Sequence, residues 1–298
     1  MEKIANIQTR IKAQKSWKMT THCSLKDKTL IISGASRGIG LAIAKRAAQD
    51  GANIVILAKT TKPHPVLPGT IFTAAKEIED MGGKALPLQC DIRDEKQVQL
   101  CVEKAVQKFG GIDIVINNAS AINLSDTEKV SMKRYDLMHS VNTRGTFLLT
   151  KTCLPYLKKS THAHVLNLSP PLAMKTEWFE GHVAYTMAKY GMSMCVLGWS
   201  GEFRQYGISV NALWPRTAIA TAAVQNHLGG DESIRRSRTV DILSDTAHMI
   251  LTTKPLQFTG NFFIDETLLK ENGVTDFSKY LNDKSVKEEE LIEDFFLP

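Results

Sequence analysis

The feature that most restricts the fold of this chain is a repeated alternation between short, apolar, β-branched runs and longer stretches of helical periodicity. Runs such as Asn53–Ala58 (NIVILA) and Asp113–Asn117 (DIVIN) are apolar almost throughout, as expected for strands covered on both faces. Strands that alternate with helices are typical of a parallel sheet with crossover helices. The pattern therefore predicts an α/β fold built on a doubly wound parallel sheet.

Seven strands are predicted, and they lie at Thr29–Ser33, Asn53–Ala58, Lys84–Cys90, Asp113–Asn117, Ala163–Ser169, Ile208–Leu213 and Gly260–Ile264. Helices are predicted at Ile39–Asp50, Ile71–Met81, Glu95–Phe109, Met132–Leu157, Val183–Tyr206 and Asp241–Leu251. A chain of 298 residues suits one domain of this kind with short ends. We place the domain at residues 25–264, between a basic N-terminal extension (1–24) and an acidic C-terminal extension (265–298). Residues 218–238 are expected to be a helical or mobile insertion.

Charge and hydropathy exclude several classes of function. The net charge of +6 divides into +4 on residues 1–18, −6 on residues 265–298, and +8 on the body between them. Such a body suits anionic small molecules, but there is no basic stripe with interleaved aromatic residues, so no nucleic-acid partner is expected. No run approaches the roughly 20 apolar residues of a membrane span, so no membrane-spanning segment is expected.

The cysteines and histidines give no sign of a metal or disulfide framework. The five cysteines are scattered and contain no C-x-x-C pair, which favours reduced thiols in an intracellular, soluble protein. His162, His164 and His182 lack acidic or thiol companions at ligand spacing. No metal site is therefore expected.

A glycine-rich turn follows the first predicted strand. Residues 34–40 read G-A-S-R-G-I-G and open a helix. Glycine is needed where the backbone turns sharply and lets a pyrophosphate approach a helix N-terminus, because a Cβ there would clash. Glycines placed between the first strand and the first helix of a βαβ unit predict a dinucleotide-binding turn.

The end of the second strand indicates which dinucleotide is bound. An acid there would hydrogen-bond the ribose 2′-hydroxyl of NAD, but the chain has Lys59, and Arg37 lies in the glycine turn. Two cations favour the 2′-phosphate of NADP(H), although Lys59 could also be merely solvated. Asp91, after the third strand, is expected near the adenine edge; the alternative is that it caps the helix starting at Asp94.

Tyr185 and Lys189 are four residues apart in a predicted helix, so both side chains project from one face about one turn apart. A tyrosine in water ionises near pH ~10, too high for an efficient base at neutral pH. A nearby ammonium ion, together with a positive nicotinamide, would favour the phenolate and lower that pKa. A bare Y-x-x-x-K also occurs by chance in many helices, so the pair by itself is a weak signal.

Taken together, these motifs make the chain similar to the short-chain dehydrogenase/reductase family. The residues that carry the resemblance are SGASRGIG (33–40), NNAS (117–120), VNTRGTF (141–147) and YTMAK (185–189). They stand in the family's order, and the resemblance covers about residues 25–264. It implies a single-domain Rossmann fold and an NADP(H)-dependent oxidoreductase.

The resemblance also implies roles for individual residues. The phosphate-binding turn is matched by Gly34, Ser36, Arg37, Gly38, Ile39 and Gly40. Further cofactor contacts are matched by Lys59, Asp91, Asn118, Lys189 and Thr217. Tyr185 matches the general acid/base and Lys189 its activator. Asn142 matches the residue that anchors a water in the proton relay, but it could instead bend the helix. Thr217 could contact the carboxamide or simply cap the next helix.

The chain departs from the family where a serine polarises the substrate carbonyl. Pro170 occupies the expected position in Asn167-Leu168-Ser169-Pro170-Pro171. Neighbouring strand residues point to opposite faces, so Ser169 reaches the carbonyl only if the two prolines reshape the strand end; Thr176 is a weaker substitute. A missing oxyanion donor costs on the order of 10²–10³ in turnover elsewhere.

This departure leaves two functional hypotheses. The first is an oxidoreductase acting on a hydroxyl, carbonyl or enoyl group of a lipid-like substrate, such as a steroid, a fatty acyl chain or an acyl-CoA. Arg216 replaces the glycine usual after Pro215 and would add a cation at the pocket mouth, which favours an anionic acyl carrier. The second is a catalytically weak or inactive NADP-binding protein that acts through lipid or protein partners.

The remaining expectations concern assembly and location. The two long helices Met132–Leu157 and Val183–Tyr206 carry more apolar surface than one sheet face can cover, which indicates a homodimer or homotetramer. Residues 1–18 resemble a mitochondrial transit peptide, with a disordered arm as the alternative. The end carries no S-K-L-type signal, so a peroxisomal location would follow from the resemblance alone.

Overall fold

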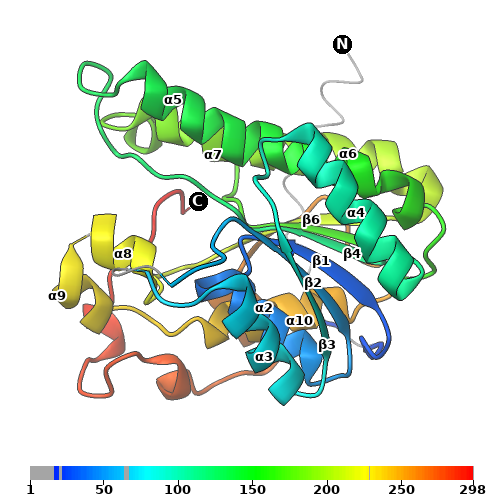
Figure 1. Cartoon of the computed structure of the whole chain (residues 1–298). Helices are drawn as coiled ribbons and strands as arrows, with labels where there is room; N and C mark the ends of the chain where they lie inside the picture. The colour runs from blue at the N-terminus through cyan, green and yellow to red at the C-terminus, as the bar shows by residue number, and fades with distance from the viewer. Residues whose placement is uncertain (1–16, 20–21, 64–66, 228, 298) are drawn as a thin grey trace, which may run out of the picture.

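The structure, a computed structural model, describes residues 17–19, 22–63, 67–227 and 229–297. Its centre is a seven-stranded, all-parallel sheet in the order β3-β2-β1-β4-β5-β6-β7 (Figure 1). The strands are β1 Thr29–Ser33, β2 Asn53–Ala58, β3 Lys84–Gln89, β4 Ile114–Asn117, β5 His164–Asn167, β6 Ser209–Trp214 and β7 Phe262–Ile264. The predicted doubly wound sheet is confirmed. The transit-peptide expectation concerns residues 1–18, of which 1–16 lie outside the described residues.

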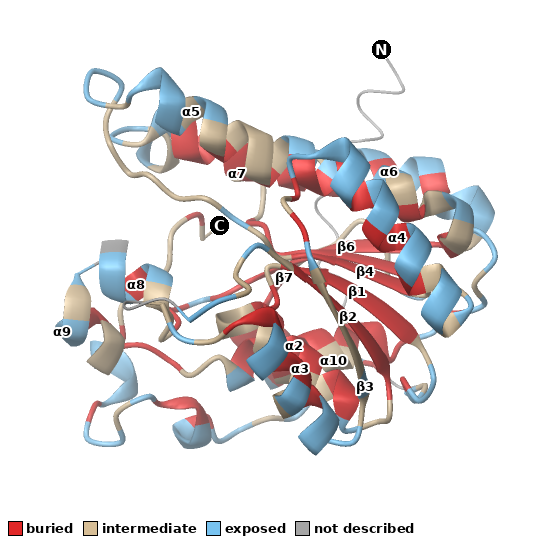
Figure 2. Cartoon of the chain, in the orientation of Figure 1, coloured by how far each residue is buried: buried red, intermediate tan, exposed pale blue. Residues whose placement is uncertain are grey.

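The helices form one layer on each face of the sheet (Figure 1). They are α2 Gly38–Ala48, α3 Ile71–Asp80, α4 Glu95–Phe109, α5 Met132–Met138, α6 Gly145–Leu157, α7 Val183–Glu202, α8 Ala222–His227, α9 Gly230–Arg235, α10 Asp241–Leu251 and α11 Asp265–Glu271. One layer consists of α2, α3 and α10, and the other of α4, α6 and α7. The central strands are buried on both sides, as Figure 2 shows in red, which explains their nearly continuous apolar sequences.

Most predicted elements agree with the structure, and the differences have local causes. The β5 strand is shorter than the predicted Ala163–Ser169 because the amide of Ser169 donates to the carbonyl of Asn167 (2.9 Å), which turns the chain out of the sheet. Two short helices, α8 and α9, form within residues 218–238, so that insertion is helical in part.

The long predicted helix Met132–Leu157 is continuous but not uniform. Its middle, His139–Arg144, is a π-helical segment between α5 and α6. Such a bulge inserts an extra residue into a helical turn and is common at functional sites. Here it places the side chain of Asn142 inside the molecule, where it is fully buried.

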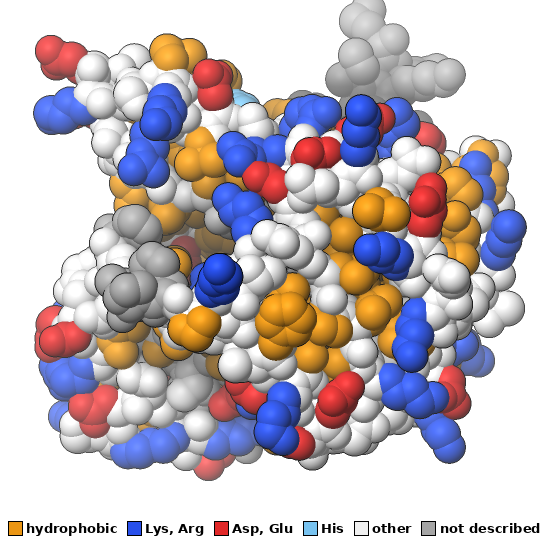
Figure 3. Space-filling view, viewed as in Figure 1, with side chains coloured by type: hydrophobic (Ala, Val, Ile, Leu, Met, Phe, Trp, Pro, Cys, Tyr) orange, Lys and Arg blue, Asp and Glu red, His pale blue; other side chains and the backbone are white. Residues whose placement is uncertain are grey.

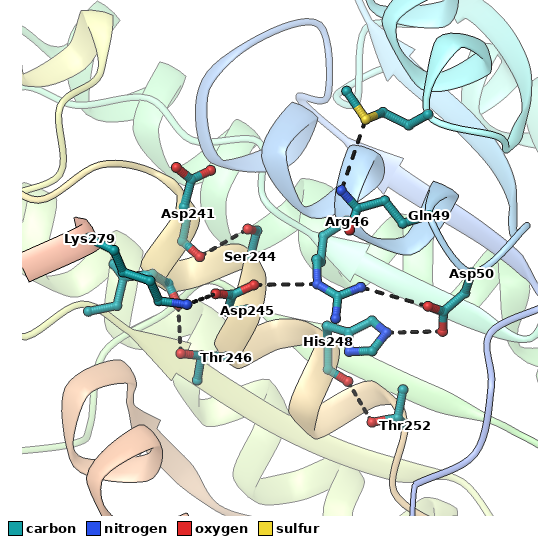
Figure 4. Close-up of polar contacts among 12 residues, drawn as sticks. Arg46, Gln49, Asp50, Asp241, Ser244, Asp245, Thr246, His248, Thr252 and Lys279 are labelled. Atoms are coloured by element: carbon teal, nitrogen blue, oxygen red, sulfur yellow. Dashed lines mark hydrogen bonds and ion pairs between the residues drawn. The ribbon is translucent and has the colours of Figure 1, made fainter. Parts of the chain in front are cut away.

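A network of charges fastens α2 to α10 on the face opposite α7 (Figure 4). Arg46 of α2 contacts Asp245 of α10 (3.3 Å), and Asp50 accepts a hydrogen bond from the amide of Leu25 and contacts the ring of His248 (3.0 Å). The pKa of Asp50 is lowered, because these partners outweigh the opposing effect of its burial. The network holds the C-terminal end of α2 against α10.

The residues after β7 pack against the domain. Leu268, Leu269, Phe277 and Tyr280 belong to the same apolar core as α2 and α10. Arg238, which is buried, contacts the carboxylate of Glu266 (3.0 Å). Within the described ranges, no helix is long and apolar enough to cross a membrane, and no three His, Cys, Asp or Glu side chains gather as a metal site would need.

Candidate active site

The candidate site lies at the carboxyl ends of the central strands. The chain runs from β1 to β2 on one side and returns to β4 on the other, so a crevice forms between β1 and β4, where doubly wound sheets bind ligands. A groove of about 710 Å³ occupies this position, lined by the glycine turn, the end of β2, the loop after β4 and helix α8. Figure 3 shows the surface hollowed between α5 and α8.

The glycine turn is shaped by close backbone approach. Gly34 has a φ of +70° and Gly38 a φ of +58°, both in the left-handed region that favours glycine. A Cβ on Gly40 would lie 2.5 Å from Nδ2 of Asn118. That nitrogen donates to the carbonyls of Ser33 (3.0 Å) and Gly34 (3.1 Å). Asn118, predicted as a cofactor contact, therefore also holds the turn in shape from beneath.

The two predicted cations both line the groove. The guanidinium of Arg37 donates to the carbonyls of Pro68 (2.7 Å) and Gly69 (3.1 Å), so the loop after β2 holds it beside the turn. Lys59, at the end of β2, is exposed. The two side chains thus border the part of the groove at the end of β2, where the second strand of a dinucleotide fold meets the adenosine ribose.

Asp91 lines the same end of the groove and has an ion-pair partner there. Its carboxylate accepts hydrogen bonds from the guanidinium of Arg93, the shortest at 2.6 Å, and this contact lowers the pKa of Asp91 to about 2. The cap of α4 is Asp94, whose side chain accepts from the amides of Lys96 and Gln97. The capping alternative for Asp91 is therefore wrong, and its contact with the adenine edge of a cofactor stays a prediction.

Tyr185 and Lys189 lie on the buried face of α7, one turn apart, and are only 6% and 3% exposed. The ammonium of Lys189 donates to the carbonyl of Leu168 (2.7 Å) and lies 4.9 Å from the centre of the Trp214 ring. Burial raises the pKa of Tyr185 and lowers that of Lys189 to about 7. The expected lowering of the tyrosine pKa is absent in this arrangement, because burial and the neighbouring Asp294 carboxyl both disfavour the phenolate.

Asn142 uses both polar atoms of its side chain on one residue. Its Oδ1 accepts from the amide of Ala121 (2.7 Å), and its Nδ2 donates to the carbonyl of Ala121 (3.0 Å). These bonds fasten the loop after β4 to the π-helical segment. The side chain thus has a structural role in the loop, while the predicted place of Asn142 in a proton relay stays a prediction.

Two predicted site residues are buried hydroxyls without a hydrogen-bond partner among the described residues, Ser169 and Thr217. An unpaired buried hydroxyl is costly, so such a group is typical of a site that a bound molecule completes. Ser169 follows Leu168, whose carbonyl holds Lys189. Thr176 is exposed, which disfavours it as a substitute. The hydroxyl of Thr217 and the crowded glycine turn both fit a dinucleotide cofactor.

The structure also brings to this site residues that the sequence did not single out. The indole nitrogen of Trp214 donates to the carbonyl of Phe295 (2.8 Å), and the ring of Phe296 lies 6.1 Å from that of Tyr185. The only signal in the sequence is an aromatic pair within an otherwise acidic end. Its contact with a tyrosine more than a hundred positions earlier could not be inferred from spacing.

Comparison with known proteins agrees with this geometry. Residues 28–229 match the family model described as short chain dehydrogenase. The chain is 59% identical over 269 residues to the hydroxysteroid dehydrogenase-like protein 2 of Bos taurus, an alignment that covers 90% of this chain and 63% of that protein. The chain spans between 50% and 63% of the length of such curated relatives.

Solved structures give the same result. A short chain dehydrogenase from Mycobacterium thermoresistibile is 52% identical, with a TM-score of 0.86 over 92% of this chain and 96% of the other. The NADH-dependent reductase A1-R′, solved with NAD bound, is 25% identical, with a TM-score of 0.65 over 80% of this chain and 95% of the other. With the groove, the glycine turn and the Tyr185–Lys189 pair, these matches show that the chain belongs to the short-chain dehydrogenase/reductase family of oxidoreductases.

Proposed function

We propose that the protein is an NADP(H)-dependent oxidoreductase that acts on a hydroxyl, carbonyl or enoyl group of a lipid-like substrate. The observation that carries this proposal is that a groove lined by the glycine turn and two cations shares Ala121 and Ile122 with the apolar cluster in which Tyr185 is buried. The proposal joins a dinucleotide-binding end to a proton-transfer end within one crevice.

The chain's own residues would divide the work as follows. The turn at residues 34–40 would hold the pyrophosphate, and the hydroxyl of Thr217 would bond the carboxamide. The bound cofactor would supply or accept the hydride. Tyr185 would give a proton to the substrate oxygen or take it away, and Lys189, held by the Leu168 carbonyl, would stabilise the phenolate when its amine is protonated. Ser169 would donate to the substrate carbonyl.

The cofactor preference has a direct test. Arg37 and Lys59 provide two positive charges where a ribose 2′-phosphate would lie, and no acid stands at the end of β2 to repel it. Titration of the purified protein should show NADPH binding at least tenfold tighter than NADH. Equal affinities would refute the preference, and no binding of either would refute the whole proposal.

The proposed substrate class is supported by the side chains packed around Tyr185. Tyr185, Trp214 and Phe296 belong to an apolar cluster around the catalytic groups. Arg216, about half exposed, stands at the edge and contacts Glu293 (3.1 Å). An apolar chain with an anionic carrier, such as an acyl-CoA, fits this combination. Turnover of NADPH with a panel of acyl-CoA, steroid and carbonyl compounds tests the class.

A second function is favoured by one observation. Tyr185 and Lys189 do not line the open groove, so the catalytic end is covered. A protein that stays in this form would bind NADP(H) and turn over little, and would act through lipid or protein partners. Tight NADPH binding without turnover of any compound in the panel would establish this alternative over the first.

Assembly and location remain predictions with their own tests. Phe147 of α6 and Met187, Met194 and Leu197 of α7 are about half exposed, which supports a homodimer or homotetramer built on these helices. Light scattering on the purified protein would measure the mass. We also propose a peroxisomal or mitochondrial location and a role in lipid metabolism, which imaging of the tagged protein in cells would test.

A further inference from the structure

Residues 291–297, which we call the strap, pack against the apolar cluster that contains Tyr185. The strap's backbone pairs with the loop that follows β6. The amide of Ala218 donates to the carbonyl of Ile292 (2.8 Å), and the amide of Asp294 donates to the carbonyl of Arg216 (3.0 Å). In Figure 1 the red end of the chain lies in the space between α7 and α8. The strap thus lies over the catalytic residues.

The ring of Phe296 is the centre of this contact. It is 0% exposed and lies within a box of five aromatic rings. The ring centres stand 5.5 Å away for Tyr190, 5.9 Å for Trp178 and Trp214, and 6.1 Å for His182 and Tyr185. Phe296 is thus the apolar occupant of a pocket that includes the catalytic tyrosine.

Several features oppose this closed arrangement, which the backbone pairing, the hydrogen bond from Trp214 to Phe295 and the buried ring of Phe296 stabilise. The φ of Phe296 is +67°, a region that bulky residues rarely adopt, so the backbone is strained to place the ring. The ion pair between Arg216 and Glu293 is largely exposed and contributes little. Burial, together with the nearby Asp265 carboxyl, raises the pKa of Asp294 to about 7 against the opposing effects of the Phe295 amide and Lys189, so closing removes a carboxyl group from water.

The closed strap also explains the state of the site. The open groove ends before Tyr185 and Lys189, and the hydroxyls of Ser169 and Thr217 are buried without a partner among the described residues. A substrate that contacts Tyr185 from within the box of aromatic rings would need the space that the Phe296 ring fills. Binding of such a substrate and closure of the strap are therefore mutually exclusive.

We propose that the aromatic box is the binding site for the apolar part of the substrate, and that Phe296 occupies it in the resting protein and is displaced when substrate binds. The proposal rests on the proposed function, whose catalytic tyrosine forms one wall of the box. The ligand is an acyl chain or fused ring system, because the walls are aromatic and Phe296, itself apolar, fits them. A ligand must therefore compete with the Phe296 ring for the box, and the ring lowers the ligand's apparent affinity.

The test measures binding of dodecanoic acid by calorimetry, without cofactor or turnover. Removing the ring with Phe296→Ala should tighten binding at least tenfold relative to the wild type, because the ligand no longer competes with it. Phe72→Ala is the matched control, since it removes a ring that is 56% exposed on α3, remote from the box. It should bind as the wild type does.

Hydrogen exchange on the wild type provides a second measurement that needs no variant. At saturating dodecanoic acid, the strap's amides, including the one that Asp294 donates to Arg216, should lose protection. Absence of binding by both proteins, equal or weaker binding by Phe296→Ala, or strap amides that stay protected at saturation would overturn the proposal. Both measurements are made without NADPH. Failure of the proposed function would appear in NADPH binding or turnover, whereas failure of this proposal would appear in dodecanoic acid binding and in hydrogen exchange of the strap.

Discussion

Replacing Asn142 by alanine separates a structural from a catalytic role for its side chain. The change removes two hydrogen bonds of 2.7 and 3.0 Å and leaves the amide and carbonyl of Ala121 without their partner. Each unpaired group costs about 1–3 kcal/mol. Ala121 is partly exposed, so water compensates in part, and we expect the free energy of unfolding to fall by about 2–3 kcal/mol.

Urea denaturation followed by circular dichroism measures this loss. With a slope near 3 kcal/mol per molar urea, the midpoint should fall by about 1 M. Asn123→Ala is the matched control, because its side chain makes one longer bond (3.3 Å) to the amide of Ser125 in the same loop. It should lose less than about 1 kcal/mol. A stable Asn142→Ala protein that has lost turnover would refute the structural role.

Three further predictions follow from single contacts. Lys59→Asp should weaken NADPH binding at least tenfold and leave NADH binding unchanged or tighter, and equal losses for both cofactors would show that Lys59 does not read the 2′-phosphate. Gly40→Ala places a Cβ 2.5 Å from Nδ2 of Asn118. It should lower the free energy of unfolding by about 1–3 kcal/mol and abolish NADPH binding. A stable variant that binds NADPH as the wild type does would contradict the close approach. Burial lowers the pKa of His164 to about 3, so the unfolded chain binds a proton more readily than the folded protein. The free energy of unfolding should therefore fall as the pH drops from 6.5 toward 3. The urea midpoint should fall less steeply with pH for His164→Phe than for the wild type, and parallel curves would contradict this.

Much of the fold follows from the sequence because the signals are local. Strand β1 and helix α4 were predicted with the bounds that the structure gives, since β-branched runs and the Asp94 cap act over a few residues. The glycine turn is equally local, because a left-handed φ at Gly34 and the crowding at Gly40 both require glycine. The i,i+4 spacing of a helix brought Tyr185 and Lys189 to one face.

The rest depends on contacts between distant parts of the chain. The direction of the pKa shift of Tyr185 depends on burial, and that burial comes partly from Phe296. The two hydrogen bonds between Asn142 and Ala121 form at a π-helical bulge, which no residue pattern in the sequence predicts. Trp214 binds a carbonyl more than eighty residues later in the chain. Local periodicity carries no information about such pairs.

The central claim is that the phenol of Tyr185 transfers the proton during NADPH-dependent reduction. The measurement is the initial rate of NADPH oxidation by wild type and Tyr185→Phe, with the acyl-CoA or carbonyl compound that the wild type turns over fastest, beside NADPH titrations of both proteins. We predict that turnover falls by roughly 10²–10⁴ while NADPH affinity stays within about twofold. A Tyr185→Phe enzyme that binds NADPH normally and turns over within tenfold of the wild type would contradict the claim.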